Sequence, residues 1–112
     1  MEKYIQIYTT TNKKESAESI SQAFIEKRLA ACAQVVGPIK STYWWQGAIE
    51  QGEEWLCLIK SKFSLYKQIE ETIKKMHPYT VPEIIAVPVL AANPDYLSWM
   101  DAELDNSNTA AS

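Results

Sequence analysis

Few side chains in this 112-residue sequence could do chemistry, and they are far apart. His77 is the only histidine, and Cys32 and Cys57 are the only thiols. A transition-metal site needs several His, Cys or carboxylate ligands, and these three residues do not form a spaced ligand motif. Cysteine–histidine catalysis is disfavoured because both cysteines lie in apolar runs, where a thiolate is unstable. Two interpretations of His77 remain open: a metal ligand, or a structural residue in the last turn of a helix.

Aromatic and soft side chains near these positions also have two interpretations. Tyr43, Trp44 and Trp45 could line a ligand cage, but packing within a hairpin or between subunits is the commoner role of such a cluster. Met76 continues a helical stripe that includes Tyr66, which favours a place in the core over a role as a soft ligand. We therefore expect packing roles for both groups.

Composition excludes several classes of function. With 46% apolar residues, the chain can form a core without metals or disulfides. The net charge of −3 and the scattered lysines give no basic stripe, so we expect no nucleic-acid binding. No apolar run approaches the ~20 residues that a spanning helix needs, so we expect no membrane insertion. One arginine and three glycines do not provide a phosphate-binding loop, and we expect no enzyme activity.

Hydrophobic periodicity predicts the elements that hold these residues. The predicted order is strand, helix, strand, strand, helix, strand and a short terminal helix, over residues 4–10, 13–29, 32–45, 48–60, 61–77, 84–90 and 93–104. Right-handed crossovers in both halves then give an α+β fold, the ferredoxin-like βαββαβ plait, with a four-stranded antiparallel sheet and helices on one face. We expect one domain over residues 1–104 and a disordered tail over residues 105–112.

Polar and proline residues predict where these elements begin and bend. Asn12, Ser61 and Asn93 each precede a helical pattern and are expected to be its N-cap. Pro38 and Pro88 interrupt strand patterns and predict bulges or unpaired edges, because proline cannot donate to a ladder.

The hairpin turn predicts the position of the cysteines. A turn at Gln46–Gly47 would place Cys57 opposite Val36 and Cys32 opposite Ser61. The two thiols would then be about 13 Å apart along the strands, beyond the ~7 Å between Cα atoms that a disulfide allows. Since the chain begins in a strand-like pattern with no signal peptide, we expect both cysteines to be reduced and the protein to be cytoplasmic.

Four ordered segments carry a specific resemblance to a known family. They are residues 27–33 (KRLAACA), 41–50 (STYWWQGAIE), 77–85 (HPYTVPEII) and 93–99 (NPDYLSW). Over nearly the whole chain the sequence resembles the CutA divalent-cation tolerance proteins. The resemblance implies a ferredoxin-like homotrimer, similar in architecture to the PII signalling proteins, in which long strands pair between subunits.

The resemblance also implies where a metal would bind. In some bacterial members a copper site uses a first-strand cysteine and a pair of histidines before the Pro-Tyr step. In this sequence Tyr8 and Met76 stand at two of those positions, and only His77 matches. We therefore expect a weak contact to Cu(II) or another divalent cation through His77, assisted by Glu83 or by another subunit, and no further cofactor.

Two functional hypotheses follow from the resemblance. The first is a cytoplasmic homotrimeric protein of divalent-cation (copper) tolerance, with weak or indirect metal binding. The second is a PII-like interaction module that binds a small ligand or a protein partner at the clefts between subunits. Tyr8 and Met76, in place of ligands, favour the second over a dedicated copper binder.

Overall fold

The computed structural model describes residues 3–105. Its elements follow the predicted order, with one 3-10 turn, Phe63–Leu65, added between the third strand and the second helix. The strands are β1 (Tyr4–Thr11), β2 (Cys32–Trp45), β3 (Ala48–Lys62) and β4 (Ile85–Pro88), and the helices are α1 (Lys14–Glu26), α2 (Tyr66–Met76) and α3 (Pro94–Glu103).

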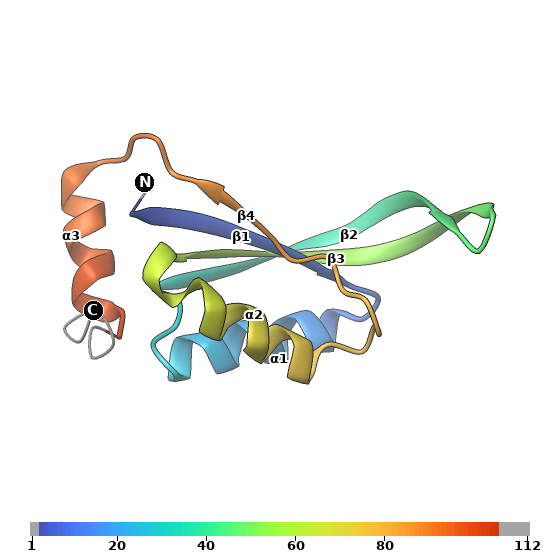
Figure 1. Cartoon of the computed structure of the whole chain (residues 1–112), viewed down its shortest axis with the longest axis horizontal. Helices are drawn as coiled ribbons and strands as arrows, with labels where there is room; N and C mark the ends of the chain where they lie inside the picture. The colour runs from blue at the N-terminus through green and yellow to red at the C-terminus, as the bar shows by residue number, and fades with distance from the viewer. Residues whose placement is uncertain (1–2, 106–112) are drawn as a thin grey trace.

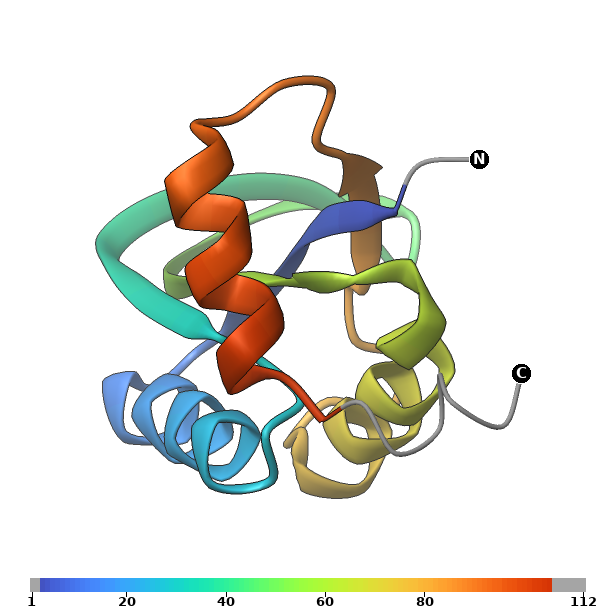
Figure 2. The ribbon, with the colours of Figure 1, turned by 90° about the vertical axis from the view of Figure 1, so that its left-hand side faces the viewer.

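All strand pairs in the sheet are antiparallel, and the strand order is β2-β3-β1-β4. This strand order, with a helix between β1 and β2 and another between β3 and β4, is that of the predicted ferredoxin-like plait, which is confirmed. α1 and α2 lie beneath one face of the sheet, and α3 lies at one end (Figures 1 and 2). The core between the sheet and these two helices contains fully buried side chains from β1, α1, β3 and α2, namely Ile7, Phe24, Ile59 and Ile73. Each contributes about 1.5–3 kcal/mol by leaving water.

Thr9 of β1 is fully buried, and its hydroxyl makes no hydrogen bond to the protein. An unpartnered buried hydroxyl costs about 1–3 kcal/mol, because it loses its bonds to water on folding. We therefore expect Thr9→Val to raise the free energy of unfolding by about 1 kcal/mol, measured by urea titration. Thr11→Val is the matched control, because the Thr11 hydroxyl donates to the Lys13 carbonyl oxygen at 2.8 Å and its loss should lower stability. Equal effects of the two substitutions would contradict the prediction.

β2 and β3 form a long hairpin whose outer part projects beyond the rest of the molecule (Figure 1). The chain turns at Gln46 and Gly47, whose φ angles are +50° and +81°. Two successive positive φ angles are typical of a tight hairpin turn, and glycine adopts them without strain. The predicted turn is confirmed. We call the outer part, residues 39–54, the arm.

A bulge separates the arm from the part of the hairpin that packs on the core. Val36 pairs with Leu56 but Ile39 pairs with Glu54, so two residues of β2 face only Trp55. One of those two residues is Pro38, from which a bulge was predicted. The bulge was expected, but its effect on register was not included in the prediction.

The two cysteines are free, as predicted. Their predicted partners were each wrong by one residue, since Cys57 pairs with Val35 and Cys32 with Lys60. The cause is the bulge, which advances β2 by one residue relative to β3.

One of the three predicted helix caps is confirmed. Asn93 accepts a hydrogen bond from the backbone N–H of Asp95 at 2.9 Å. Asn12 is not a cap, because α1 begins one residue later, with Lys13 as its N-cap and no side-chain cap bond. Ser61 is also not a cap: it remains in β3, where its hydroxyl donates to the carbonyl oxygen of Leu29 at 2.6 Å.

The first helix and the last strand are shorter than predicted. α1 ends at Glu26, and Arg28 adopts a positive φ of 58° that stops the helix before the predicted end at Leu29. The last strand is limited to residues 85–88, the four that pair with β1.

The far end of the fold is fixed by contacts between α3 and the turn after α1. The Arg28 guanidinium donates to the carbonyl oxygen of Glu103 at 2.9 Å, and the N–H of Asp105 donates to the carbonyl oxygen of Arg28 at 2.8 Å. Of the predicted tail, residues 106–112 lie outside the described residues. The single domain over residues 1–104 stays a prediction.

Candidate functional site

His77 directly follows α2 and is only 8% exposed. Its Nε2 atom lies 2.7 Å from the carbonyl oxygen of Thr10, at the end of β1. Its Nδ1 atom accepts a hydrogen bond from the backbone N–H of Tyr79 at 3.1 Å. The ring therefore bonds the backbone of a distant strand and of its own loop. The carbonyl that it meets belongs to β1, not to the last turn of the helix.

These two contacts define the protonation state of the ring. A backbone N–H can only donate, so the Nδ1 atom of His77 carries a lone pair directed at Tyr79. The single proton of the neutral ring is then on Nε2, which donates it to the Thr10 carbonyl. Burial lowers the pKa of His77, although the Thr10 carbonyl and the Glu54 carboxylate oppose the shift. The neutral ring is therefore the form present at neutral pH.

Tyr79 extends this network to the third strand. Its hydroxyl donates to a carboxylate oxygen of Glu54 at 2.7 Å, and its ring meets the His77 ring edge-on, with centroids 4.8 Å apart. Burial, followed by the bond to the Glu54 carboxylate, raises the pKa of Tyr79, so the phenol keeps its proton. Glu54 is itself only 9% exposed. A continuous chain of hydrogen bonds thus joins β1, the loop after α2 and β3.

The other residues considered as metal ligands do not gather around His77. Glu83 is exposed, and the Tyr8 hydroxyl lies on β1, where it accepts a bond from the Gln6 amide at 3.1 Å. Met76 is 39% exposed, so the expectation that it lies in the core is wrong. Within residues 3–105 no group of three or more His, Cys, Asp or Glu side chains is placed to hold a metal ion. The residues present do not fit a copper site within one chain; a contact completed by another subunit stays a prediction.

Cys57 is fully buried between β3 and α1. Its thiol donates to the carbonyl oxygen of Ala17 at 3.6 Å and accepts a bond from the Ser21 hydroxyl at 3.9 Å. Burial raises the pKa of the Cys57 thiol, and the bond from Ser21 only partly offsets the shift. A thiol that is inaccessible and protonated is neither a nucleophile nor a ready metal ligand.

The two thiols should differ sharply in reactivity. At pH 8 we expect a disulfide-exchange reagent to label the half-buried Cys32 first, and Cys57 about a thousandfold more slowly, because Cys57 must wait for unfolding. The rates are measured by absorbance. Cys32→Ser should remove the fast reaction, and Cys57→Ser should retain it. Comparable rates at the two positions would show that the core opens far more readily than the structure indicates.

The arm carries the largest exposed aromatic surface among the described residues. Trp44 is 73% exposed, Ile49 62%, Trp45 57% and Tyr43 47%. Trp44 and Ile49 are cross-strand partners and share one face of the arm. Side chains of this kind in contact with water mark a surface that binds another molecule. The hairpin packing expected for these residues is therefore not found within one chain.

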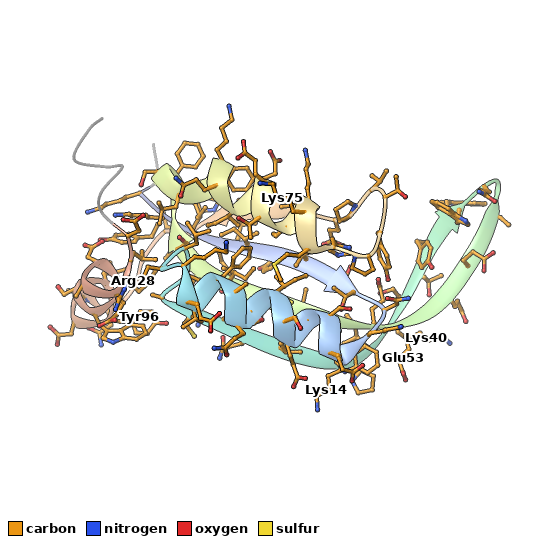
Figure 3. The ribbon with its side chains drawn as sticks, turned by 90° about the horizontal axis from the view of Figure 1, so that it is seen from below. Lys14, Arg28, Lys40, Glu53, Lys75 and Tyr96 are labelled. Carbon is orange, nitrogen blue, oxygen red and sulfur yellow. The ribbon has the colours of Figure 1, made fainter. Side chains whose placement is uncertain are left out.

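A shallow depression lies at the root of the arm, beside the bulge. Lys40 and Glu53 are cross-strand partners and lie together there (Figure 3). The residues that line it are Pro38, Ile39, Lys40, Gln51, Gly52 and Glu53. It is open, and both apolar and charged side chains line it.

Comparison with known proteins identifies the family. A sequence profile of the CutA1 divalent ion tolerance proteins matches residues 5–103. The chain belongs to the CutA1 family. The resemblance of the four motifs is thereby confirmed.

Relatives in the CutA1 family are similar along most of the chain. The divalent-cation tolerance protein CutA of Thermus thermophilus is 40% identical over 94 residues, which cover 84% of this chain and 91% of that protein. The mouse protein CutA is 41% identical over 106 residues, which cover 92% of this chain but 60% of the mouse protein.

Solved structures of CutA1 proteins have the same fold. Rice CutA1 superposes with a TM-score of 0.91 at 36% identity, covering 94% of this chain and 96% of that one. The CutA of Archaeoglobus fulgidus, described as a periplasmic divalent cation tolerance protein, superposes with a TM-score of 0.88 at 35% identity, covering 91% of this chain and 99% of that one.

No helix within residues 3–105 is both long and apolar enough to cross a membrane.

Sequence reasoning found His77 but missed the partners that define its role. Thr10, Tyr79 and Glu54 carry no motif of their own in the sequence. One local signal was available: the proline between His77 and Tyr79 favours a turn that directs the Tyr79 N–H back to the ring. The contacts to Thr10 and Glu54 join residues far apart in the chain and required the sheet register.

Proposed function

We propose that this member of the CutA1 family acts in divalent-cation tolerance, copper included, as a cytoplasmic homotrimer that binds metal weakly or indirectly. The exposed aromatic surface of the arm is the observation that carries the proposal. It shows a molecule with a large apolar surface to cover, while the same chain lacks the donor set for a dedicated metal site within residues 3–105.

The arm supports assembly through second copies of the same chain. A two-stranded ribbon is marginally stable alone in water, and this one exposes large apolar side chains on both of its faces. β2 and β4 also form the two unpaired edges of the sheet, which favour pairing with another chain. A contact between the arm of one copy and a different surface of the next closes into a ring if the rotation allows it. Three copies would form such a ring.

The chemistry of the side chains supports a non-catalytic role. The lone pair of the His77 ring is already directed at Tyr79, so the ring is not a ready general base. The buried Cys57 thiol is not a ready nucleophile. Tolerance would then arise from binding, and not from chemical conversion of a substrate.

The depression at the root of the arm supports a second candidate function. A PII-like module would bind a small molecule or a protein partner at clefts between subunits, with metal incidental. The lysine and glutamate pair there, next to the amide of Gln51, could bind a ligand that carries both charges. In this alternative the arm would form one wall of the cleft.

Growth in copper tests the proposal. Cells that lack their own CutA1 protein are complemented with the wild-type chain, with Trp44→Glu, or with Ser19→Glu, which adds the same charge on the exposed face of α1. Wild type and Ser19→Glu should extend growth to higher copper concentrations, and Trp44→Glu should not. Cell fractionation should find the protein in the cytoplasm. Equal growth with and without the wild-type chain would reject the tolerance role.

A further inference from the structure

We infer that His77 is a positioning residue in this chain and not a copper ligand: its ring holds the loop after α2 against β1 and, through Tyr79, against the root of the arm. The inference deepens the proposed function and rests on it, because it assumes that tolerance arises by the indirect route. It disagrees with the expectation that His77 contacts the metal.

The two ring contacts leave no site for a cation. A metal ion binds a ring nitrogen through its lone pair. On His77 the only lone pair in the ring plane is on Nδ1, and it receives the Tyr79 N–H at 3.1 Å. Nε2 carries the proton and lies 2.7 Å from the Thr10 carbonyl oxygen. An entering cation would have to break one of these bonds and leave a backbone group without its partner in a region that is only 8% exposed.

The second half of the network fixes the arm. Glu54 pairs with Ile39 and is therefore in the first residue pair beyond the bulge. The bond from the Tyr79 hydroxyl to Glu54 ties that pair to the loop, and His77 ties the same loop to the end of β1. The direction in which the arm leaves the sheet is thus constrained at Glu54 of β3 by the loop that His77 holds.

The same loop also leads to the free edge of the sheet. It runs from His77 to Ile85, where β4 begins by pairing with Tyr8. Another copy of the chain would meet both the arm and this edge if the two surfaces assemble together. His77 holds the loop that lies between the arm and this edge. It therefore acts on assembly through Tyr79 and Glu54, without itself contacting the neighbouring copy.

Nuclear magnetic resonance of the ring tests the inference on the wild-type protein. The two-bond correlation of the ¹⁵N-labelled imidazole should show the Nε2–H tautomer, and Zn(II) added up to one ion per chain should leave it unchanged. This measurement needs no variant, so it remains decisive if a His77 variant does not fold. The Nδ1–H tautomer, or a saturable shift of the imidazole signals with Zn(II), would overturn the inference.

Variants separate the positioning role from metal binding. His77→Ala should give the same Cu(II) calorimetric isotherm as wild type while the Tyr79 amide exchanges its hydrogen about tenfold faster or more. Tyr79→Phe should speed amide hydrogen exchange at the root of the arm. The backbone N–H of residue 79 should keep its hydrogen bond to the His77 ring. Met76→Ala, an exposed neighbour, is the matched control and should change neither measurement.

Two results would overturn the positioning role. One is saturable Cu(II) binding near one ion per chain that is lost in His77→Ala but retained in Met76→Ala. The other is unchanged exchange of the Tyr79 amide in a folded His77→Ala variant. Neither depends on growth in copper, so failure of the proposed tolerance role and failure of this inference are distinguishable.

Discussion

Replacing Trp44 by glutamate should convert the proposed trimer into monomers of 12.7 kDa. Trp44 is 73% exposed in the isolated chain and has Ile49 beside it on the same face of the arm, so the two form the centre of an apolar contact. Loss of a central tryptophan costs about 2–4 kcal/mol at a protein interface, and a carboxylate in its place adds several kcal/mol of desolvation. In a closed ring every contact loses this amount, so assembly should fail completely.

Sedimentation equilibrium or native mass spectrometry measures the result. Wild type and the Ser19→Glu control should both have three times the mass of one chain, since Ser19 lies on the exposed side of α1. Trp44→Glu should keep its circular dichroism spectrum, because the side chain has little contact with the core of its own chain. A trimer of Trp44→Glu, or a monomer of wild type, would contradict an assembly built on the arm.

Gly37→Ala should be strongly destabilising, although it adds only one methyl group. A Cβ atom at this position would lie 2.4 Å from Cδ1 and 2.8 Å from Cγ of Trp55, the residue that faces the bulge. The indole must move away, because these atoms belong to the part of the ring nearest its own backbone. Overpacking of this kind costs about 1–3 kcal/mol, which corresponds to roughly 4–8 °C in melting temperature per kcal/mol for a domain near this size.

Gly52→Ala is the matched control for this substitution. Gly52 lies on the other strand of the same hairpin, and an added Cβ would meet only the Tyr43 hydroxyl, at an ordinary 3.7 Å. We expect a change within about 0.5 kcal/mol. Both variants are compared with wild type at one protein concentration by urea titration, since stability of an oligomer depends on concentration. Equal losses in the two variants would mean that the close approach to Trp55 has little energetic effect.

Local sequence patterns predicted the fold well wherever the backbone preference of one or two residues determines the local structure. The turn at Gly47 and the cap at Asn93 depend on the backbone preferences of those residues, and both are confirmed. The caps predicted at Asn12 and Ser61 are wrong, because a polar residue that precedes a helical pattern does not have to cap the helix. The Ser61 hydroxyl instead bonds a carbonyl across the fold, which no local pattern indicates.

The candidate site was predictable only in part, for a physical reason. His77 is recognisable because it is the only histidine and lies beside a proline. Its role depends on Thr10 and Glu54, which reach it through strand register and not through spacing in the sequence. The bulge shifted the pairing of β2 with β3 by one residue, so even a correct hairpin turn gave the wrong residues opposite the two cysteines.

The strand order has a consequence for how the chain folds. β1 lies in the interior of the sheet, but its partners are made later: β3 ends at Lys62 and β4 at Pro88. The β2–β3 hairpin can close locally as soon as it is synthesised, whereas β1 must wait for partners that lie 44 or more residues away in the sequence, as in the pair Thr11 and Trp55. During this interval Ile5 and Ile7, which are buried in the folded protein, are exposed in the nascent chain. Docking of β1 onto the finished hairpin is therefore the step at which protection from aggregation begins.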